Sequence, residues 1–294
     1  MILVFGGHGQ LGQELVARAN DVSVPLTAVG RAEVDVADPK MIARVIAKFR
    51  PTLLVNAAAY NLVDKAETQQ PQAQRTNALG AAVVAAAAKR AGLPLIHIST
   101  DYVFDGEKGR PYVEDDPVGP VNVYGKTKAA GEEGVRNGHV HHLIFRTAWL
   151  FGVYGSNFVK NVLRLAAERD SLDFVAAQRG SPTGTADLAQ AILVAADAIK
   201  RGSATWGTYH VAGAGSTSRH GLAAEVVEVQ ARFTGRSPKV NVVGVADFPT
   251  AAPRPAYSVL DSTKFEAAFG YAPGHWRKAV EVTVSNLLTS KEPA

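Results

Sequence analysis

Two side chains that could move a proton stand four residues apart in this sequence. Tyr124 and Lys128 occupy positions i and i+4 of a helix predicted over about 122–136, which places both on one helix face. A tyrosine hydroxyl, with an ordinary pKa of about 10, is a poor acid–base group at neutral pH, and an adjacent ammonium stabilises the phenolate. The spacing therefore indicates a Tyr–Lys acid–base pair. The structural alternative is a half-buried Tyr beside a solvated Lys.

A hydroxyl group follows an earlier predicted strand, in the segment Ile98–Phe104. Ligands in open α/β sheets bind at the carboxyl ends of parallel strands, so Thr100 is placed to hydrogen-bond a carbonyl group held there. Thr100, Tyr124 and Lys128 together would form a reduction site. A helix-capping role for Ser99 or Thr100 is the alternative.

Glycines recur after the first predicted strand, in a GxxGxxG pattern at Gly6, Gly9 and Gly12 that opens directly into a helical pattern. Glycines there permit a tight turn and close approach of the backbone to a pyrophosphate, and the helix N-terminus offers free N–H groups. The position in a βαβ unit favours a dinucleotide site over an ordinary βα turn.

The residue after the second predicted strand indicates which dinucleotide binds. Arg31 stands where an arginine would accept a 2′-phosphate, which favours NADP(H). Glu33 and Asp35 nearby keep NAD(H) open, because an acidic side chain would hold the ribose 2′-hydroxyl. A solvated surface charge is the alternative for Arg31. Small residues in 56–60 stand where a cofactor would cross the sheet edge, or serve tight packing alone.

These side chains need a parallel sheet to position them. The first half of the chain alternates apolar runs with helical patterns, which predicts βαβ units and a doubly wound α/β (Rossmann) fold. The expected strands are Ile2–Phe5, Val22–Val29, Leu53–Asn56, Leu95–Ser99 and His142–Arg146. The expected helices are at about 10–20, 38–49, 71–91, 122–136, 156–169, 185–201 and 218–234, and a further apolar run lies at 239–245.

The alternation breaks after Trp149, where glycines and prolines punctuate shorter segments. We therefore expect two domains. A dinucleotide-binding domain covers 1–150 and is rejoined by about 183–235, and a smaller, discontinuous substrate domain covers 151–182 and 236–294.

The composition narrows the function classes. The 294 residues are 47% hydrophobic and 20% charged, which suits a large core. The net charge of +4 comes from scattered basic residues and does not predict nucleic-acid binding. The absence of cysteine excludes thiolate chemistry and Cys-ligated zinc. Without an export leader or a membrane-length apolar run, we expect a cytoplasmic protein that binds no membrane.

Over nearly its whole length the sequence resembles the dTDP-4-dehydrorhamnose reductases, extended short-chain dehydrogenases of the deoxysugar pathway. The motifs that carry this resemblance are GGHGQLGQEL at 6–15, VNAAAYNLVDKAE at 55–67, STDYVFDG at 99–106, PVNVYGKTKAAGE at 120–132, FRTAWLFG at 145–152, SPTGTADLA at 181–189 and PRPAYSVLDSTKF at 253–265. The resemblance implies reduction of the 4-keto group of dTDP-4-dehydro-β-L-rhamnose with NADPH or NADH, the final step of dTDP-L-rhamnose synthesis for cell-envelope polysaccharide.

The resemblance also implies residue roles. Tyr124 would donate the proton to the C4 oxygen, Lys128 would hold the nicotinamide ribose and tune Tyr124, and Thr100 would orient the keto group and adjust Tyr124. The residues expected to bind substrate are Thr100, Asp101, Tyr124, Trp149 and Arg254, the last by meeting the nucleotide diphosphate. Those expected to bind the cofactor are Gly6, His8, Gly9, Gln10, Leu11, Gly12, Arg31, Asp35, Val36, Ala58, Ala59, Tyr60, Asn61, Tyr124 and Lys128.

Some positions depart from the family pattern. The segment 216–220 reads STSRH where relatives often carry an aromatic or Thr-rich segment. Some relatives dimerise through magnesium held by acidic side chains; Glu14 matches one such position, but Ala186 stands where another acid is expected, so no metal is predicted. A homodimer remains open.

Two other functions compete with the reductase. One is a 4-epimerase or 4,6-dehydratase acting on nucleotide sugars, but a dehydratase often has an Asp–Glu pair after the active threonine, and here Asp101–Tyr102 follows Thr100. The other is a non-catalytic, NADP-binding regulatory subunit that resembles this family and binds methionine adenosyltransferase.

Overall fold

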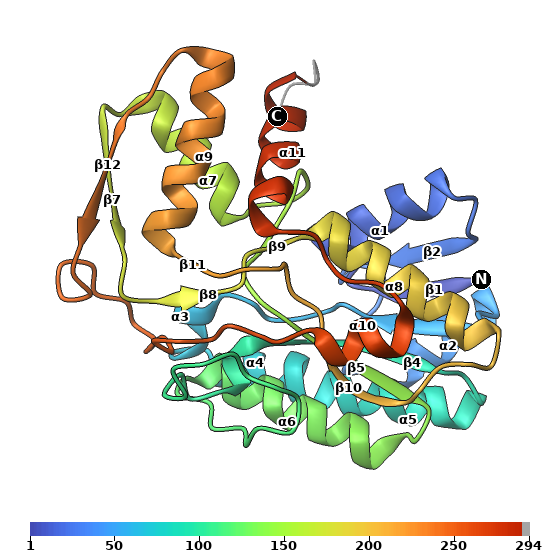
Figure 1. Ribbon diagram of the computed structural model, residues 1–294. Helices are drawn as coiled ribbons and strands as arrows, with labels where there is room; N and C mark the ends of the chain where they lie inside the picture. The colour runs from blue at the N-terminus through green and yellow to red at the C-terminus, as the bar shows by residue number, and fades with distance from the viewer. Residues whose placement is uncertain (290–294) are drawn as a thin grey trace.

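One parallel sheet of six strands organises residues 1–289, which are the residues that the computed structural model describes (Figure 1). The strands follow the order β10-β5-β4-β3-β1-β2, and every neighbouring pair is parallel. Their bounds are β1 Ile2–Phe5, β2 Leu26–Val29, β3 Leu53–Asn56, β4 Leu95–Thr100, β5 His142–Thr147 and β10 Gly207–His210. All residues of β1, β3, β4 and β5 are buried, as near-continuous apolar runs predict.

Helices cover both faces of this sheet. Ile2 and Val4 of β1 pack in one hydrophobic core, and Leu3 and Phe5 pack in another, because successive strand residues point to opposite faces. The helices of the first core are α1 Gln10–Asp21, α8 Thr185–Lys200 and α10 Thr263–Phe269, and those of the second are α2 Pro39–Phe49, α5 Gly80–Ala91 and α6 Val123–Gly138. The predicted doubly wound α/β fold is confirmed.

A second, smaller group of elements packs beside the sheet, at the upper left of Figure 1. It has its own hydrophobic core, built from α7, α9 and α11 around residues such as Val162, Val226 and Val280. Two parallel strands, β7 and β12, flank these helices. The bounds are α7 Phe158–Glu168, β7 Ser171–Val175, α9 Arg219–Thr234, β12 Lys239–Val243 and α11 Trp276–Thr289.

Short elements connect the two groups. Strand β6 pairs with β9, and β8 pairs with β11. The remaining elements are α3 Val63–Ala66, α4 Gln70–Gln74, a π-helical turn Arg75–Leu79, a 3₁₀ turn Asp101–Val103, β6 Leu150–Phe151, β8 Arg179–Gly180, β9 Thr183–Gly184 and β11 Thr217–Ser218.

The packing places two segments differently from the predicted domain boundaries. Helix α9 falls within the return expected over 183–235, yet Leu222 and Val226 bury themselves against α7 and α11. Helix α10 falls within the substrate region expected over 236–294, yet Phe265 enters the core of the sheet. The apolar face of each helix decides in which core the helix packs. We therefore propose that α8, β10 and α10 belong to the cofactor-binding unit, and that α9 belongs to the smaller unit.

Strand β2 is shorter than the predicted run 22–29. Ser23 adopts a left-handed φ of 55°, and the Val24 N–H returns to the carbonyl of Ala19 at 2.8 Å. Pro25 has no N–H to give to a ladder. The chain therefore joins the sheet only at Leu26. Within residues 1–289, no helix is long and apolar enough to cross a membrane.

Candidate active site

The carboxyl end of β1 leads into a glycine turn suited to an anion. Gly6 has a φ of +87°, and a Cβ there would lie 2.7 Å from the backbone of Ala57, so glycine alone lets the turn approach the end of β3. Helix α1 has Gly9 at its N-cap, and no side chain caps it. Its first N–H groups and the positive end of the helix dipole are therefore available to a pyrophosphate.

The end of β2 carries one exposed cation and two engaged carboxylates. Asp35 accepts a hydrogen bond from Arg75 at 2.7 Å, and this partner holds the pKa of Asp35 below its usual value. Glu33 accepts the backbone N–H of residue 30 at 2.6 Å and lies 3.5 Å from Nε2 of His8. Arg31 is exposed directly after the strand.

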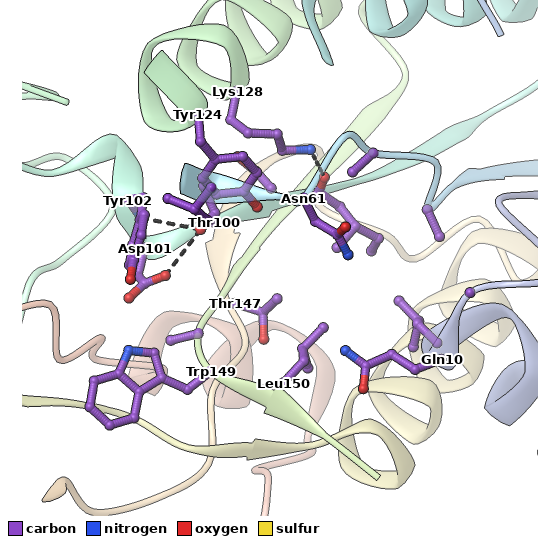
Figure 2. Close-up of a pocket in the computed structure, with 18 of the residues that line it drawn as sticks. Gln10, Asn61, Thr100, Asp101, Tyr102, Tyr124, Lys128, Thr147, Trp149 and Leu150 are labelled. Atoms are coloured by element: carbon purple, nitrogen blue, oxygen red, sulfur yellow. Dashed lines mark hydrogen bonds between the residues drawn. The ribbon is translucent and has the colours of Figure 1, made fainter. Parts of the chain in front are cut away.

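Tyr124, Lys128 and Thr100 line a single pocket at the carboxyl end of the sheet (Figure 2). Helix α6 begins at Val123 because the side chain of Asn122 accepts the N–H of Gly125 at 2.8 Å. This cap puts Tyr124 in the first helical turn and Lys128 one turn later. Thr100 is the last residue of β4, and its hydroxyl lies close enough to Tyr124 to lower the pKa of that phenol.

Lys128 is buried and held in place by the sheet. Its side chain is 2% exposed, and Nζ donates to the carbonyl of Ile98 at 2.6 Å. Burial lowers the pKa of Lys128 to about 8, although the nearby Glu132 favours the charged form. Glu132 is itself paired with Arg146 at 2.8 Å inside the core. A fixed ammonium with further donors thus faces the pocket.

Tyr124 is kept in its protonated form. Burial raises the pKa of Tyr124 above its ordinary value, and the nearby Thr100 hydroxyl opposes that rise in pKa. The Thr100 hydroxyl thus favours the phenolate, in line with the adjusting role expected of it, and the tuning role expected of Lys128 stays a prediction. A buried, protonated phenol is suited to donating a proton rather than to taking one.

The side of the pocket away from Gln10 and the glycine turn carries Asp101 and Trp149 (Figure 2). Asp101 is 2% exposed and accepts hydrogen bonds from Thr100 at 3.0 Å and Ser258 at 2.6 Å. Burial raises the pKa of Asp101 to about 6. Trp149 has a φ of +46°, an unusual conformation for a bulky residue, and its indole packs on Gly180, where a Cβ would lie 2.5 Å from the ring. With this unusual backbone conformation, the indole ring of Trp149 lines one side of the pocket.

Asn77 fixes the loop that follows β3. Its Oδ1 accepts the backbone N–H of Tyr60 at 2.8 Å, and its Nδ2 donates to the Tyr60 carbonyl and to Oγ1 of Thr127, both at 3.0 Å. Asn77 lies in the π-helical turn, an irregularity that often marks functional sites. The sequence does not single out Asn77, because 71–91 shows one uninterrupted helical pattern.

The structure brings most of the predicted site residues into this pocket. Those lining it are Gly6, Gly9, Gln10, Leu11, Gly12, Ala59, Asn61, Thr100, Asp101, Tyr124, Lys128 and Trp149. Those outside its lining are His8, Arg31, Asp35, Val36, Ala58, Tyr60 and Arg254. Arg254 instead donates to Asp64 at 2.8 Å. The lining residues that the sequence analysis did not single out include Tyr102, Thr147, Leu150 and Arg219.

Two buried polar atoms in the pocket lack partners on the protein. They are Oε1 of Gln10 and Oγ1 of Thr147, and both residues line the pocket. Buried polar atoms are nearly always hydrogen-bonded, so each is suited to a bound polar molecule. Together with the uncapped helix α1 and the glycine turn, these atoms fit a dinucleotide.

Comparison with known proteins gives one consistent family. The profile of the family described as RmlD substrate binding domain matches residues 1–289. A dTDP-4-dehydrorhamnose reductase of Burkholderia thailandensis is 40% identical, with 98% of this chain and 99% of that protein covered. One of Sinorhizobium fredii is 39% identical, with 100% and 99% covered.

Solved structures agree with these sequence matches. A dTDP-4-dehydrorhamnose reductase of Bacillus anthracis in complex with NADP superposes with a TM-score of 0.89 at 34% identity, covering 97% of this chain and 98% of that one. A Thermus thermophilus UDP-glucose 4-epimerase in complex with NAD gives a TM-score of 0.80 at 21% identity, covering 98% and 99%, and shares the fold.

Proposed function

Because this chain belongs to the family of the RmlD substrate binding domain, we propose that it is a dTDP-4-dehydrorhamnose reductase with Tyr124 as its proton donor. It reduces the 4-keto group of dTDP-4-dehydro-β-L-rhamnose to give dTDP-L-rhamnose, the final step of dTDP-rhamnose biosynthesis, and its cofactor is NADPH. The role of Tyr124 is supported mainly by one observation: Tyr124, Lys128 and Thr100 line the same pocket, which also includes the glycine turn and Trp149.

The chain's own residues divide the work of the reaction. When bound, the reduced nicotinamide supplies a hydride to the keto carbon. The Tyr124 hydroxyl, kept protonated by burial, donates its proton to the keto oxygen. The Thr100 hydroxyl favours the phenolate that remains. Lys128, anchored by the Ile98 carbonyl, presents its other N–H donors to the cofactor ribose.

The cofactor is held mainly by backbone groups. We assign the pyrophosphate to the turn at Gly6–Gly12 and the open end of α1. Arg31 supplies the 2′-phosphate contact, since Glu33 and Asp35 are engaged by other groups. Asn77 positions the loop around Tyr60 against which the cofactor lies.

The competing functions have weaker support. A dehydratase needs a further acid–base pair, yet Tyr102 follows Asp101 at the pocket, and burial raises the pKa of its hydroxyl. Epimerases and dehydratases keep their nicotinamide through the cycle, so release of one oxidised cofactor per substrate separates a reductase from both. A non-catalytic regulatory subunit has no need of an assembled Tyr–Lys–Thr site; co-purification with a synthetase and no sugar-dependent NADPH oxidation would favour it.

The experiment is NADPH oxidation by wild type and Tyr124→Phe, with the 4-keto sugar generated in situ by the preceding dehydratase and epimerase. Loss of the proton donor should lower turnover by roughly 10²–10⁴-fold while NADPH affinity changes little. Tyr271→Phe is the matched control, because it removes a phenol hydroxyl that bonds Asp187 outside the pocket. Unchanged turnover in Tyr124→Phe would reject Tyr124 as the acid.

Two finer assignments accompany this proposal. We propose a cytoplasmic location, tested by cell fractionation. We also propose a homodimer, tested by light scattering of the purified protein at several concentrations.

A further inference from the structure

A guanidinium group forms part of the pocket wall beside Trp149. Arg219 is the first residue of α9, which begins there because Ser218 accepts the N–H of Gly221 at 3.0 Å. Its guanidinium carbon lies 3.7 Å from the centroid of the Trp149 ring and 5.1 Å from that of Phe158. Two aromatic rings therefore fix the plane of this cation.

Arg219 has no carboxylate partner at contact distance. Within residues 1–289, no carboxylate oxygen lies within 4.0 Å of its nitrogens, whereas Arg254 and Arg277 each have one at 2.8 Å. The Tyr102 hydroxyl lies near it and favours the charged guanidinium. A guanidinium carries five N–H donors, and stacking on a ring leaves the donors at its edges available.

The surroundings of Arg219 disfavour its positive charge as long as no anion from outside the protein is bound beside it. Burial lowers the pKa of Arg219, and the nearby positive charge of Arg254 adds to that effect. Asp101 and the Tyr102 hydroxyl favour the charged form, but Asp101 accepts its own hydrogen bonds from other groups. A half-buried charge that lacks a close counter-ion is suited to an anionic ligand.

The position of Arg219 separates it from the cofactor phosphates. Figure 2 shows Trp149 and Gln10 on opposite sides of the pocket, with Thr147 and Leu150 between them. Gln10 belongs to the glycine turn, where we place the cofactor pyrophosphate. Arg219 stacks on Trp149, so it lies at the sugar end. Arg254, the residue expected to meet the substrate diphosphate, is ion-paired with Asp64 at 2.8 Å and does not line the pocket.

We propose that Arg219 binds the diphosphate of the nucleotide sugar, an inference that rests on the proposed function. Diphosphate oxygens match the planar fork of a guanidinium, and the Trp149 and Phe158 rings hold that fork ready before the substrate arrives. The diphosphate would act as the counter-ion of Arg219, which has no carboxylate partner at contact distance within residues 1–289. This contact selects nucleoside diphosphates over uncharged sugars at the pocket entrance.

The test compares dTDP with thymidine, so that the phosphate contribution is measured by itself. Affinities of wild type and Arg219→Gln for both compounds, and for NADPH, are measured by calorimetry. We expect Arg219→Gln to lower the preference for dTDP over thymidine by about 10- to 100-fold, the loss of a charge-assisted hydrogen bond pair, with NADPH affinity unchanged. Arg219→Lys should recover part of the preference, because it keeps the charge without the fork.

Arg179→Gln is the matched control. Arg179 is an exposed arginine of β8 and pairs with Ser218, the residue before Arg219. It donates to Ser216 at 3.1 Å and does not line the pocket. Its loss should leave the preference for dTDP unchanged. An equal fall in that preference would overturn the proposal, because general surface charge would then explain it.

Two further results would overturn the proposal. One is an unchanged preference in Arg219→Gln, and the other is an equal loss of dTDP and thymidine affinity, which would mean that Arg219 only supports the Trp149 wall. Failure of the proposed function is read separately, in sugar-dependent NADPH oxidation by the wild type. Binding of dTDP through Arg219 without that oxidation would keep this proposal and reject the activity.

Discussion

Replacing Asp101 by asparagine should flatten the pH dependence of this protein's stability. Asp101 is 2% exposed, and burial raises its pKa from 3.8 to about 6. Between those values the folded protein holds a proton that the unfolded chain has lost. The stabilisation from protonated Asp101 is therefore complete below about pH 4 and is lost as the pH rises through about 6.

The magnitude follows from the pKa shift. A rise of about 2 units corresponds to about 3 kcal/mol of unfolding free energy, at about 1.36 kcal/mol per unit. Asparagine keeps the side-chain shape. Its amide oxygen can accept a hydrogen bond from one of the two hydroxyls, Thr100 or Ser258, and the other hydroxyl can rotate to accept a hydrogen bond from the amide N–H. Asp101→Asn thus removes the titration and little else.

The assay is urea unfolding of both proteins at several values between about pH 4 and pH 8. The difference between the two unfolding free energies cancels every other titrating group, and it should shift by about 3 kcal/mol in favour of the variant across this range. Ser258→Ala removes a hydrogen bond that favours the ionised form, so it should move the loss to higher pH. Parallel curves for wild type and Asp101→Asn would refute the reasoning.

Other variants test other parts of the site. Arg31→Ala should weaken NADPH binding much more than NADH binding, because only NADPH carries the 2′-phosphate; equal losses in the two dissociation constants would contradict the assignment. Asn77→Ala removes three hydrogen bonds, two of them to the backbone of Tyr60, and should raise the KM for NADPH more than that for the sugar; a purely structural role would move both alike. Gly125→Ala would place a Cβ 2.1 Å from the Tyr102 carbonyl oxygen, and thermal unfolding should show a loss of at least about 1–3 kcal/mol, whereas an unchanged melting temperature would mean that α6 can move away.

Local patterns in the sequence predict most of the sheet and its helices. The apolar runs of β1, β3, β4 and β5 are continuous because both faces are buried, and this leaves little ambiguity. Strand β2 was predicted too long, since Val22 and Val24 look like strand residues while the φ of Ser23 cannot be read from the sequence. The side on which α9 and α10 pack depends on tertiary contacts, which periodicity does not reveal.

In the site, too, local sequence patterns predict some residues, and tertiary contacts decide others. Spacing alone places Tyr124 and Lys128 on one face, and strand position places Thr100, because both rules act within one element. Arg219 cannot be identified from the sequence, since a single arginine at a helix start carries no functional signal until α9 packs beside Trp149. Arg254 was assigned by resemblance and charge, and its pairing with Asp64 joins two segments far apart in the chain.

The return of the chain to its first sheet has a consequence for biosynthesis. Strand β10 pairs with β5 only after the intervening α7 and α8 have been made, and Phe265 packs against Phe145 and Tyr209 later still. A nascent chain that has not yet reached Phe265 lacks these aromatic contacts. The core of the cofactor-binding half is therefore complete only when the chain has been made through Phe265, so this half does not fold on the ribosome as an independent N-terminal unit.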